Sequence, residues 1–352
     1  MCGVAALIGK GCEHEKVWLN EIEQVIRKRG PDVFGKISPT LKDYEITLLA
    51  SVLHLRGCPT PQPLCSPNTQ NILVYNGQIF GGLNNVFMKK KDGNDTKALL
   101  DALDECQTAT EIVHVFQTVD GPWAVLFYHA ATQKLFYGHD RMGRRSLLSK
   151  ITDTCIQLTS CTTAGDTGFQ EVPCTGLFAV DLIMDVSSDI LEITHYPWNP
   201  MNRKVHTSTG ILVPQNNEEE AIDEAVLQKA YGFMEVLSSS VRVRIESIPF
   251  QTNKENCRIG IFFSGGIDSV VLAALANVHV PLNEPIELLT VCFDSKSGFR
   301  SPDRLAAEAS WEELRRISPT REWRFIEINV DYSEVAQHTT EIQNIIQVFK
   351  NC

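Results

Sequence analysis

The sequence predicts two domains of different classes, a layered α+β domain followed by an α/β domain with a parallel sheet. In the first half, short apolar runs alternate with turn residues, as in strands of an antiparallel sheet. In the second half, a strand, a glycine turn, a helix and another strand follow in the order of a βαβ unit. Between them, residues 196–219 are rich in Pro, Asn and charge, as a linker is. We therefore expect domains at residues 1–195 and 220–352.

Each predicted element follows from its periodicity. Residues 15–30 and 94–119 carry apolar side chains at three- and four-residue spacing, which predicts amphipathic helices. Gly30 and Pro31 would end the first helix, and Asp95 or Thr96 would cap the start of the second. Strands are predicted within residues 44–55, 71–80, 123–140, 155–160 and 176–183, and in the second domain a helix within 221–245 and a strand–helix–strand unit across 257–294.

Composition excludes several classes of function. The chain has 352 residues, 43% hydrophobic and 21% charged, which is typical of a globular protein. The net charge of −11 argues against an electrostatic nucleic-acid binder, and no apolar stretch is long enough for a membrane span. Eleven scattered cysteines without a C-x-x-C pair argue against a disulfide framework or a structural zinc site. We expect a reducing, cytoplasmic setting with no nucleic-acid or membrane partner.

The stretch FFSGGIDSVVLAAL is the strongest single motif. A buried strand runs into two glycines and then a helix, so backbone N–H groups converge where the helix dipole points. Such a loop binds phosphate or pyrophosphate, although a plain tight connection has the same pattern. The loop lacks the lysine of a P-loop and the spacing of G-x-G-x-x-G.

This loop resembles the SGG-x-DS pyrophosphate loop of the N-type ATP pyrophosphatases, a family that forms acyl-adenylates and includes asparagine synthetase. The resemblance implies that backbone and hydroxyl groups cradle the phosphates of ATP. It also implies that a carboxylate lies near magnesium pyrophosphate, and that backbone at two strand ends holds the adenine. The phosphate residues would be Ser264, Gly265, Gly266 and Ser269, the carboxylate Asp268, and the adenine contacts Phe263 and Val291.

Several stretches of the first domain resemble the glutamine-dependent asparagine synthetase family, including its asparagine synthetase domain-containing members. They are MCG, RGPD, LRG with QPL, YNGQIF, NDT and HDRMGRRSLL, in the family's order. The resemblance implies a class II glutamine amidotransferase domain with an αββα N-terminal-nucleophile fold. We assign RGPD to a structural turn. In HDRMGRRSLL, His139 and Ser146 replace the family's arginine and proline, and we expect these positions to brace the fold.

Cys2 is the nucleophile that this resemblance implies. Removal of Met1 would leave a thiol and a free α-amine on one residue, and an α-amine with a pKa of about 7.7–8.0 can accept the thiol proton. Without the resemblance, Cys2 would be an incidental residue at a frayed chain end. In the family, the oxyanion donors are an asparagine side chain and the next backbone N–H, here Asn76 and Gly77. Standing alone, Asn-Gly between strands instead predicts a type I′ hairpin turn.

Three further residues would bind glutamine. Arg56 would hold the α-carboxylate through its planar fork, and Asp95 would hold the α-ammonium. The structural alternatives are an ion pair for Arg56 and a helix N-cap for Asp95. Gln78 stands where the family has glutamate, so we expect weaker glutamine binding. The glutaminase half needs no cofactor, whereas the synthetase half would use ATP with Mg²⁺.

The resemblance implies that ammonia from glutamine is transferred to an aspartyl-adenylate made from aspartate and ATP. The family's later motif SG-x-G-x-DE is absent from this sequence. We therefore expect a C-terminally shortened product with only the first part of the synthetase domain and a crippled synthetase half. The alternative is a non-catalytic amidotransferase fold that serves as an interaction or regulatory module. Oligomeric state and the identity of the acyl substrate are left open.

Overall fold

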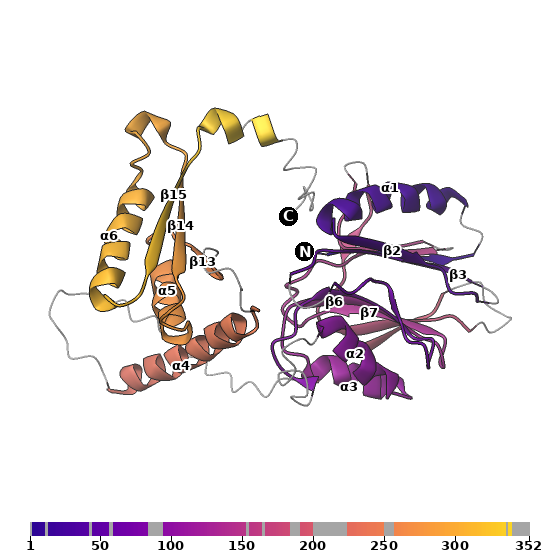
Figure 1. Ribbon diagram of the computed structural model, residues 1–352. Helices are drawn as coiled ribbons and strands as arrows, with labels where there is room; N and C mark the ends of the chain where they lie inside the picture. The colour runs from indigo at the N-terminus through magenta and orange to yellow at the C-terminus, as the bar shows by residue number, and fades with distance from the viewer. Residues whose placement is uncertain are drawn as a thin grey trace. The chain divides into compact units, whose positions relative to one another are not determined.

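The chain divides into two compact units, residues 1–199 and 200–339, in the computed structural model (Figure 1). The division falls within the stretch 196–219 that is rich in Pro and Asn. Each unit is described by itself. The described residues are 2–10, 13–41, 44–55, 59–83, 94–152, 155–163, 166–183, 191–199, 224–249, 257–335 and 337–339.

The first unit contains two six-stranded antiparallel sheets. The first sheet has the order β10-β8-β9-β1-β3-β2, so that β1 (Gly3–Gly9) lies between β9 and β3. The other strands of this sheet are β2 (Val33–Ile37), β3 (Glu45–Val52), β8 (Leu148–Ile151), β9 (Cys155–Thr159) and β10 (Gln170–Glu171).

The second sheet has the order β12-β11-β7-β6-β5-β4. Its strand β5 (Ile72–Gly77) pairs along its whole length with β6 (Trp123–His129). The remaining strands are β4 (Leu64–Cys65), β7 (Lys134–His139), β11 (Gly176–Asp181) and β12 (Ile193–Pro197).

Side-chain alternation builds four layers from these elements. In β1, Val4, Ala6 and Ile8 pack between the two sheets, whereas Ala5 and Leu7 pack under the helix α1 (Glu13–Arg29). Strand β5 alternates in the same way and turns its other face toward α2 (Asp95–Asp104) and α3 (Ala109–Thr118). Figure 1 shows α1 over one sheet and α2 and α3 under the other. The predicted αββα fold is confirmed.

The second unit is built around a three-stranded parallel sheet, β13-β14-β15. Its core includes Phe263, Ile286 and Leu288 of the sheet region and Ala307 of α6. The prediction of a parallel βαβ arrangement is confirmed. The elements are α4 (Glu224–Glu246), β13 (Ile259–Phe262), α5 (Ile267–His279), β14 (Ile286–Cys292), a short 3-10 turn (Ser295–Ser297), α6 (Pro302–Ile317) and β15 (Trp323–Asn329).

The segment 94–119 differs from its prediction in two respects. It forms two helices, because Thr108 starts α3 with a capping box to Glu111. The cap of α2 is Asn94, whose side chain accepts from the backbone N–H groups of Thr96 and Lys97. The expectation that Asp95 or Thr96 caps this helix is wrong, since the asparagine one residue earlier takes that role.

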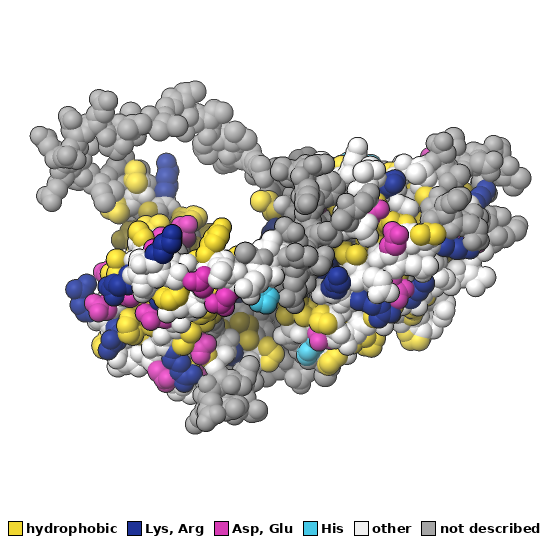
Figure 2. Space-filling model, turned by 90° about the horizontal axis from the view of Figure 1, so that it is seen from above, with side chains coloured by type: hydrophobic (Ala, Val, Ile, Leu, Met, Phe, Trp, Pro, Cys, Tyr) yellow, Lys and Arg dark blue, Asp and Glu magenta, His cyan; other side chains and the backbone are white. Residues whose placement is uncertain are grey.

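Surface chemistry agrees with the composition. On the face drawn in Figure 2, basic and acidic side chains of the described residues are interspersed. The eight cysteines in the described ranges carry free thiols. None of the helices in the described part is long and apolar enough to cross a membrane.

Candidate active site

Strand β1 and the helix above it position Cys2. The residue directly precedes β1, and its even number places it in the alternation of Val4 and Ala6, which face the space between the sheets. The next position, residue 3, must be glycine, because a Cβ there would lie 2.6 Å from the backbone oxygen of Ile26 on α1. Cys2 therefore lies on an ordered strand end that helix α1 covers closely.

The thiol of Cys2 contacts the end of β3. The backbone N–H of Leu53 lies 3.4 Å from Sγ, and its carbonyl oxygen lies 3.8 Å from Sγ. The next residue is held by the RGPD turn, since Asp32 accepts from the backbone N–H of His54 at 2.6 Å. RGPD thus orders the segment that faces Cys2, which agrees with the structural role expected for it.

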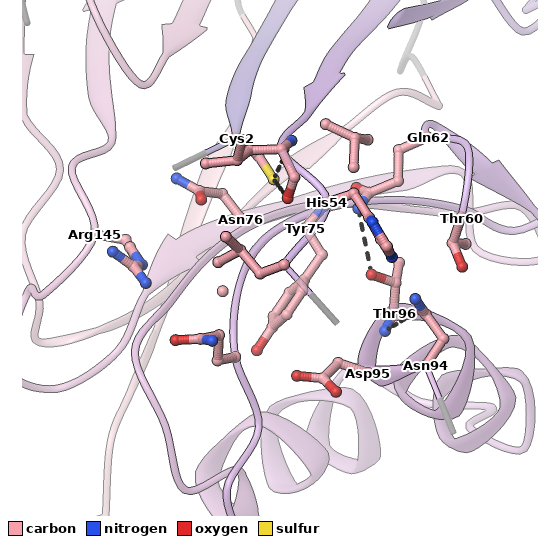
Figure 3. Close-up of a pocket in the computed structure, with 15 residues that line it drawn as sticks. Cys2, His54, Thr60, Gln62, Tyr75, Asn76, Asn94, Asp95, Thr96 and Arg145 are labelled. Carbon is pink, nitrogen blue, oxygen red and sulfur yellow. Dashed lines mark hydrogen bonds between the residues drawn. The ribbon is translucent and has the colours of Figure 1, made fainter. Parts of the chain in front are cut away.

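Cys2 opens into a pocket of about 90 Å³ (Figure 3). This volume has room for a small polar ligand rather than a macromolecule. Strand ends, the first turn of α2 and the loop after β7 all contribute walls. The lining residues are Cys2, Val52, Leu53, His54, Leu55, Thr60, Gln62, Tyr75, Asn76, Gly77, Gln78, Asn94, Asp95, Thr96 and Arg145.

Asn76 and Gly77 are the last two residues of strand β5. They pair with Ala124 and Trp123 of β6, and neither has the positive φ that a type I′ turn requires. The hairpin interpretation of Asn-Gly is therefore wrong. Gly77 is needed because a Cβ would lie 2.5 Å from the oxygen of Pro122.

The side chain of Asn76 is buried in this pocket with a free donor. It is 2% exposed, and its Nδ2 has no hydrogen-bond partner among the described residues. Gln62, of the QPL stretch, fixes the preceding residue by accepting from the backbone N–H of Tyr75 at 2.7 Å. A buried amide donor without a partner is costly unless a ligand supplies the acceptor.

Asp95 is the first residue of α2 and lies in the same pocket. It is 8% exposed, and its Oδ2 accepts from the backbone N–H of Ile79 at 2.7 Å. Because Asn94 caps the helix, the N-cap alternative for Asp95 is wrong. Its carboxylate therefore lies in the first turn of α2 and contacts the segment that follows β5.

Five of the six residues proposed for the glutaminase site line this pocket: Cys2, Asn76, Gly77, Gln78 and Asp95. The sixth, Arg56, lies outside the described residues. Gln78 is partly buried, and its backbone N–H donates to Pro122.

Arg145 also lines the pocket, although no role was predicted for it from the sequence. It lies in the loop after β7 and shares the pocket with Cys2 and Asn76. Burial lowers the pKa of its guanidinium. The largest influence that raises this pKa is the electrostatic attraction between the guanidinium and Cys2. Its only sequence signal is its place in HDRMGRRSLL.

In the second unit, the motif FFSGGIDS forms a turn between β13 and α5. Gly265 has φ +77°, and a Cβ there would lie 2.3 Å from the backbone nitrogen of Ala307 on α6. The Oγ of Ser264 accepts from the N–H of Gly266, and Ser269 donates to the carbonyl of Gly266 at 2.9 Å. Gly265 therefore has two separate reasons to be glycine.

The start of α5 offers donors to an anion. Gly266 is its N-cap and supplies no side-chain cap, so within the described residues the first-turn N–H groups are not capped by the side chain at that position. Asp268 is exposed in that turn, Phe263 is buried beneath it, and Val291 lies on the neighbouring strand β14.

This donor set fits a polyphosphate with its magnesium ion. In the described part of the chain, no three His, Cys, Asp or Glu side chains gather as a metal site. Magnesium commonly needs only one or two protein carboxylates when substrate phosphates supply the other ligands. Asp268 is the acidic side chain in the first turn of α5.

Comparisons with known proteins agree with the two-unit structure. The family described as "Glutamine amidotransferase domain" matches residues 1–168, and the family described as "Asparagine synthase" matches residues 248–346. A Homo sapiens protein described as "Asparagine synthetase domain-containing protein 1" is 28% identical, over 99% of this chain and 70% of the relative. A relative from Saccharomyces cerevisiae is 27% identical over 95% of this chain and 61% of its own length.

Among solved structures, glutamine phosphoribosylpyrophosphate amidotransferase from B. subtilis aligns with a TM-score of 0.42 at 16% identity. The alignment covers 56% of this chain and 50% of that one. The chain therefore carries a region of the glutamine amidotransferase domain family at residues 1–168, followed by a region of the asparagine synthase family at residues 248–346.

Proposed function

We propose that the first domain hydrolyses glutamine with Cys2 as the nucleophile. The observation that carries this proposal is the pocket in which a thiol, a buried amide donor and a buried carboxylate meet. These are Cys2, Asn76 and Asp95. A glutamine side-chain amide needs the first two groups, and the α-ammonium of glutamine needs the third.

The chemistry follows from these groups. After removal of Met1, the thiol proton passes to the α-amine of Cys2 and Sγ attacks the amide carbon of glutamine. Asn76 Nδ2 and the N–H of Gly77 donate to the resulting oxyanion, which costs no reorganisation if the donors are preformed. The protonated α-amine of Cys2 then gives its proton to the leaving nitrogen. Ammonia departs, and the tetrahedral species becomes a γ-glutamyl thioester. Water then hydrolyses the thioester to glutamate and regenerates the thiol.

The two charges of glutamine would be held at separate points. Asp95 would bind the α-ammonium, and Arg56 would pair with the α-carboxylate. At the position of Gln78 the family has glutamate. The neutral amide of Gln78 would attract the α-ammonium of glutamine less strongly than that carboxylate.

In the second domain, the turn Ser264–Ser269 would bind the phosphates of ATP. Its uncapped helix start supports this, because the backbone donors are available to an anion. Magnesium held by Asp268 and the phosphates would neutralise charge as pyrophosphate leaves, and backbone near Phe263 and Val291 would hold the adenine. The side-chain carboxylate of aspartate would displace pyrophosphate from ATP to give an aspartyl-adenylate, and ammonia would then displace AMP to give asparagine.

A glutamine-analogue electrophile, 6-diazo-5-oxo-L-norleucine, tests the glutaminase site. Intact-mass and peptide analysis of the full chain should give one adduct on Cys2 of Met1-free protein, and none in Cys2→Ser. Cys174→Ser, which removes an exposed thiol elsewhere, serves as the matched control and should be labelled normally. Failure of the folded wild-type protein to form the adduct would contradict the proposal.

Pyrophosphate release from ATP tests the second half. We expect aspartate-dependent release to be absent or severely weakened, because the later motif SG-x-G-x-DE is absent from this sequence. Robust release that requires aspartate and is lost in Asp268→Asn would contradict that expectation. Release that is independent of aspartate would point to another carboxylate substrate. A non-catalytic role is the second candidate, favoured by Gln78 in the place of glutamate; saturable glutamine binding without ammonia release would support it.

A further inference from the structure

Arg145 is fixed in the Cys2 pocket by its backbone. The ring Nδ1 of His139 lies 3.1 Å from the carbonyl oxygen of Arg145, which can only accept. The next residue, Ser146, donates to the carbonyl of Ser160 at 2.9 Å, and Leu147 after it is fully buried. These contacts come from the last residue of β7 and from the residue after β9, so they hold the backbone that carries the guanidinium at two separate points.

One donor of the Arg145 guanidinium, its Nε, is buried without an acceptor among the described residues. The other arginines of the same loop are satisfied: Arg144 pairs with Asp140 at 2.9 Å, and Arg141 donates to the carbonyl of Asn199 at 2.9 Å. A structural arginine would be paired in the same way, because a buried donor without a partner costs free energy.

Few negative groups face Arg145. Asp140 is occupied, since its carboxylate accepts from Arg144 and from the backbone N–H groups of Trp123 and Met142. Tyr75 has a phenol, which is neutral near pH 7. Asp95 already accepts from the backbone N–H of Ile79, so among the described residues that line the pocket Cys2 is the group that gains negative charge during the reaction. The titratable and charged groups that face the guanidinium or line its pocket are Cys2, Arg29, His54, Tyr75, Asp95 and Asp140.

We propose that Arg145 is the electrostatic partner of Cys2, with its guanidinium stabilising the thiolate before attack. This rests on the proposed role of Cys2 as the nucleophile. Figure 3 draws Arg145 beyond Asn76, at the end of the pocket away from Thr60. That position suits a group that acts on the reacting end of the substrate, while Asp95 binds the other end. The proton still passes to the α-amine, and Arg145 lowers the energy of the anion that remains.

Alkylation of Cys2 by iodoacetamide across pH tests this role without requiring glutamine turnover. The N-terminal peptide of the full chain is quantified by mass spectrometry, so that other cysteines do not interfere. In Arg145→Met, we expect roughly tenfold slower alkylation of Cys2 near neutral pH, because the thiolate loses the guanidinium that stabilises it. Arg145→Lys keeps the charge and should restore most of the rate.

Arg141→Gln is the matched control, because this arginine lies in the same loop and bonds away from the pocket. Its alkylation profile should equal that of the wild type. A wild-type profile in folded Arg145→Met would overturn the proposal. Arg145→Gln is the replacement variant should the methionine fail to fold, since it keeps an N–H donor and removes only the charge.

If neither variant folds, a measurement on the wild-type protein tests the proposal instead. A guanidinium beside Cys2 should raise the ratio of iodoacetate to iodoacetamide rates at Cys2 above the ratio at exposed Cys174. An equal or lower ratio would overturn the proposal. A shifted alkylation profile combined with no glutamine-analogue adduct would uphold the pairing and contradict the glutaminase function.

Discussion

The carboxylate of Asp95 accepts a hydrogen bond from the backbone N–H of Ile79 at 2.7 Å. Ile79 lies two residues after Gly77, so the proposed ammonium site is tied to the segment that carries the proposed oxyanion donors. The distance between the two ends of a bound substrate is thereby set by one hydrogen bond and one short stretch of chain. A substrate longer or shorter than glutamine by a methylene would fit one end at the expense of the other.

Asp95→Asn should raise the KM for glutamine roughly 10- to 100-fold, since a charged hydrogen bond contributes about 1.5–3 kcal/mol. The amide oxygen can still accept from Ile79, so the fold should be retained. Ammonia release against glutamine concentration measures the effect. Asp101→Asn, on the exposed face of the same helix, is the control and should leave the KM unchanged. An unchanged KM in Asp95→Asn would remove the ammonium role.

Asn76→Ala should lower kcat for glutamine about 10²- to 10³-fold, the usual cost of losing one oxyanion donor. Thermal stability should change little, because Asn76 Nδ2 has no partner to lose in the described structure. Asn71→Ala gives the opposite pattern: Asn71 donates to Asp104 at 2.9 Å and accepts from the N–H of Ala130 at 2.9 Å. That variant should melt earlier and keep its kcat.

Gln78→Glu should lower the KM for glutamine roughly fivefold, because a carboxylate in the pocket adds about 1 kcal/mol of attraction to the α-ammonium. Steady-state kinetics at constant pH and ionic strength provide the measurement. The control is Gln24→Glu, which adds the same charge on the exposed face of α1. A KM that rises in Gln78→Glu would mean that Gln78 does not face the ammonium.

Two glycine variants separate folding from phosphate binding in the second unit. Gly265→Ala should destabilise the unit by about 1–3 kcal/mol, because its φ is +77° and the new methyl would collide with α6. In Gly266→Ala the methyl would meet only Ser264 Oγ at 3.4 Å, an ordinary contact. The melting temperature of Gly266→Ala should therefore be normal, whereas its ATP affinity by calorimetry should fall. Normal ATP binding in this variant would argue against the phosphate site.

His129 should make stability fall with acid. Burial lowers the pKa of this histidine, whose Nε2 lies 3.2 Å from the carbonyl of Cys106 and whose Nδ1 lies 2.8 Å from Thr132 Oγ1. The folded state holds it neutral, so its stabilising contribution is present above the unfolded pKa of about 6.5. That contribution is lost as the pH falls below 6.5 toward the lowered folded pKa. Melting temperatures at pH 7.5 and 5.5 should differ more for the wild type than for His129→Gln.

The αββα layers were predicted through the family resemblance, whereas the local turns were predicted poorly. In the structure, alternation in β1 and β5 places Cys2 and Asn76 on facing surfaces, although β1 was not among the predicted strands. The cap of α2 was misassigned because Asn94, Asp95 and Thr96 are all good cap residues, and only the backbone decides among them. The same ambiguity made Asn76-Gly77 resemble a turn, although pairing with β6 keeps it extended.

Arg145 could not be found by pattern alone. Three arginines occur in five residues, Arg141 to Arg145, and nothing in their spacing says which one enters a pocket. The structure separates them by their partners: a backbone carbonyl for Arg141, a carboxylate for Arg144 and none for the Nε of Arg145. Partner choice of this kind depends on tertiary packing, which local sequence does not encode.

The close approach of α6 to Gly265 places a tryptophan of α6, Trp311, one residue from a contact with the turn between β13 and α5. Ser310 donates to the carbonyl of Gly265 at 3.3 Å, and the adjacent Trp311 stacks on Phe325 with ring centroids 4.8 Å apart. If a nucleotide binds the turn and moves it, the movement would reach this indole through the adjacent Ser310. The fluorescence of the indole would then follow nucleotide binding without any added dye.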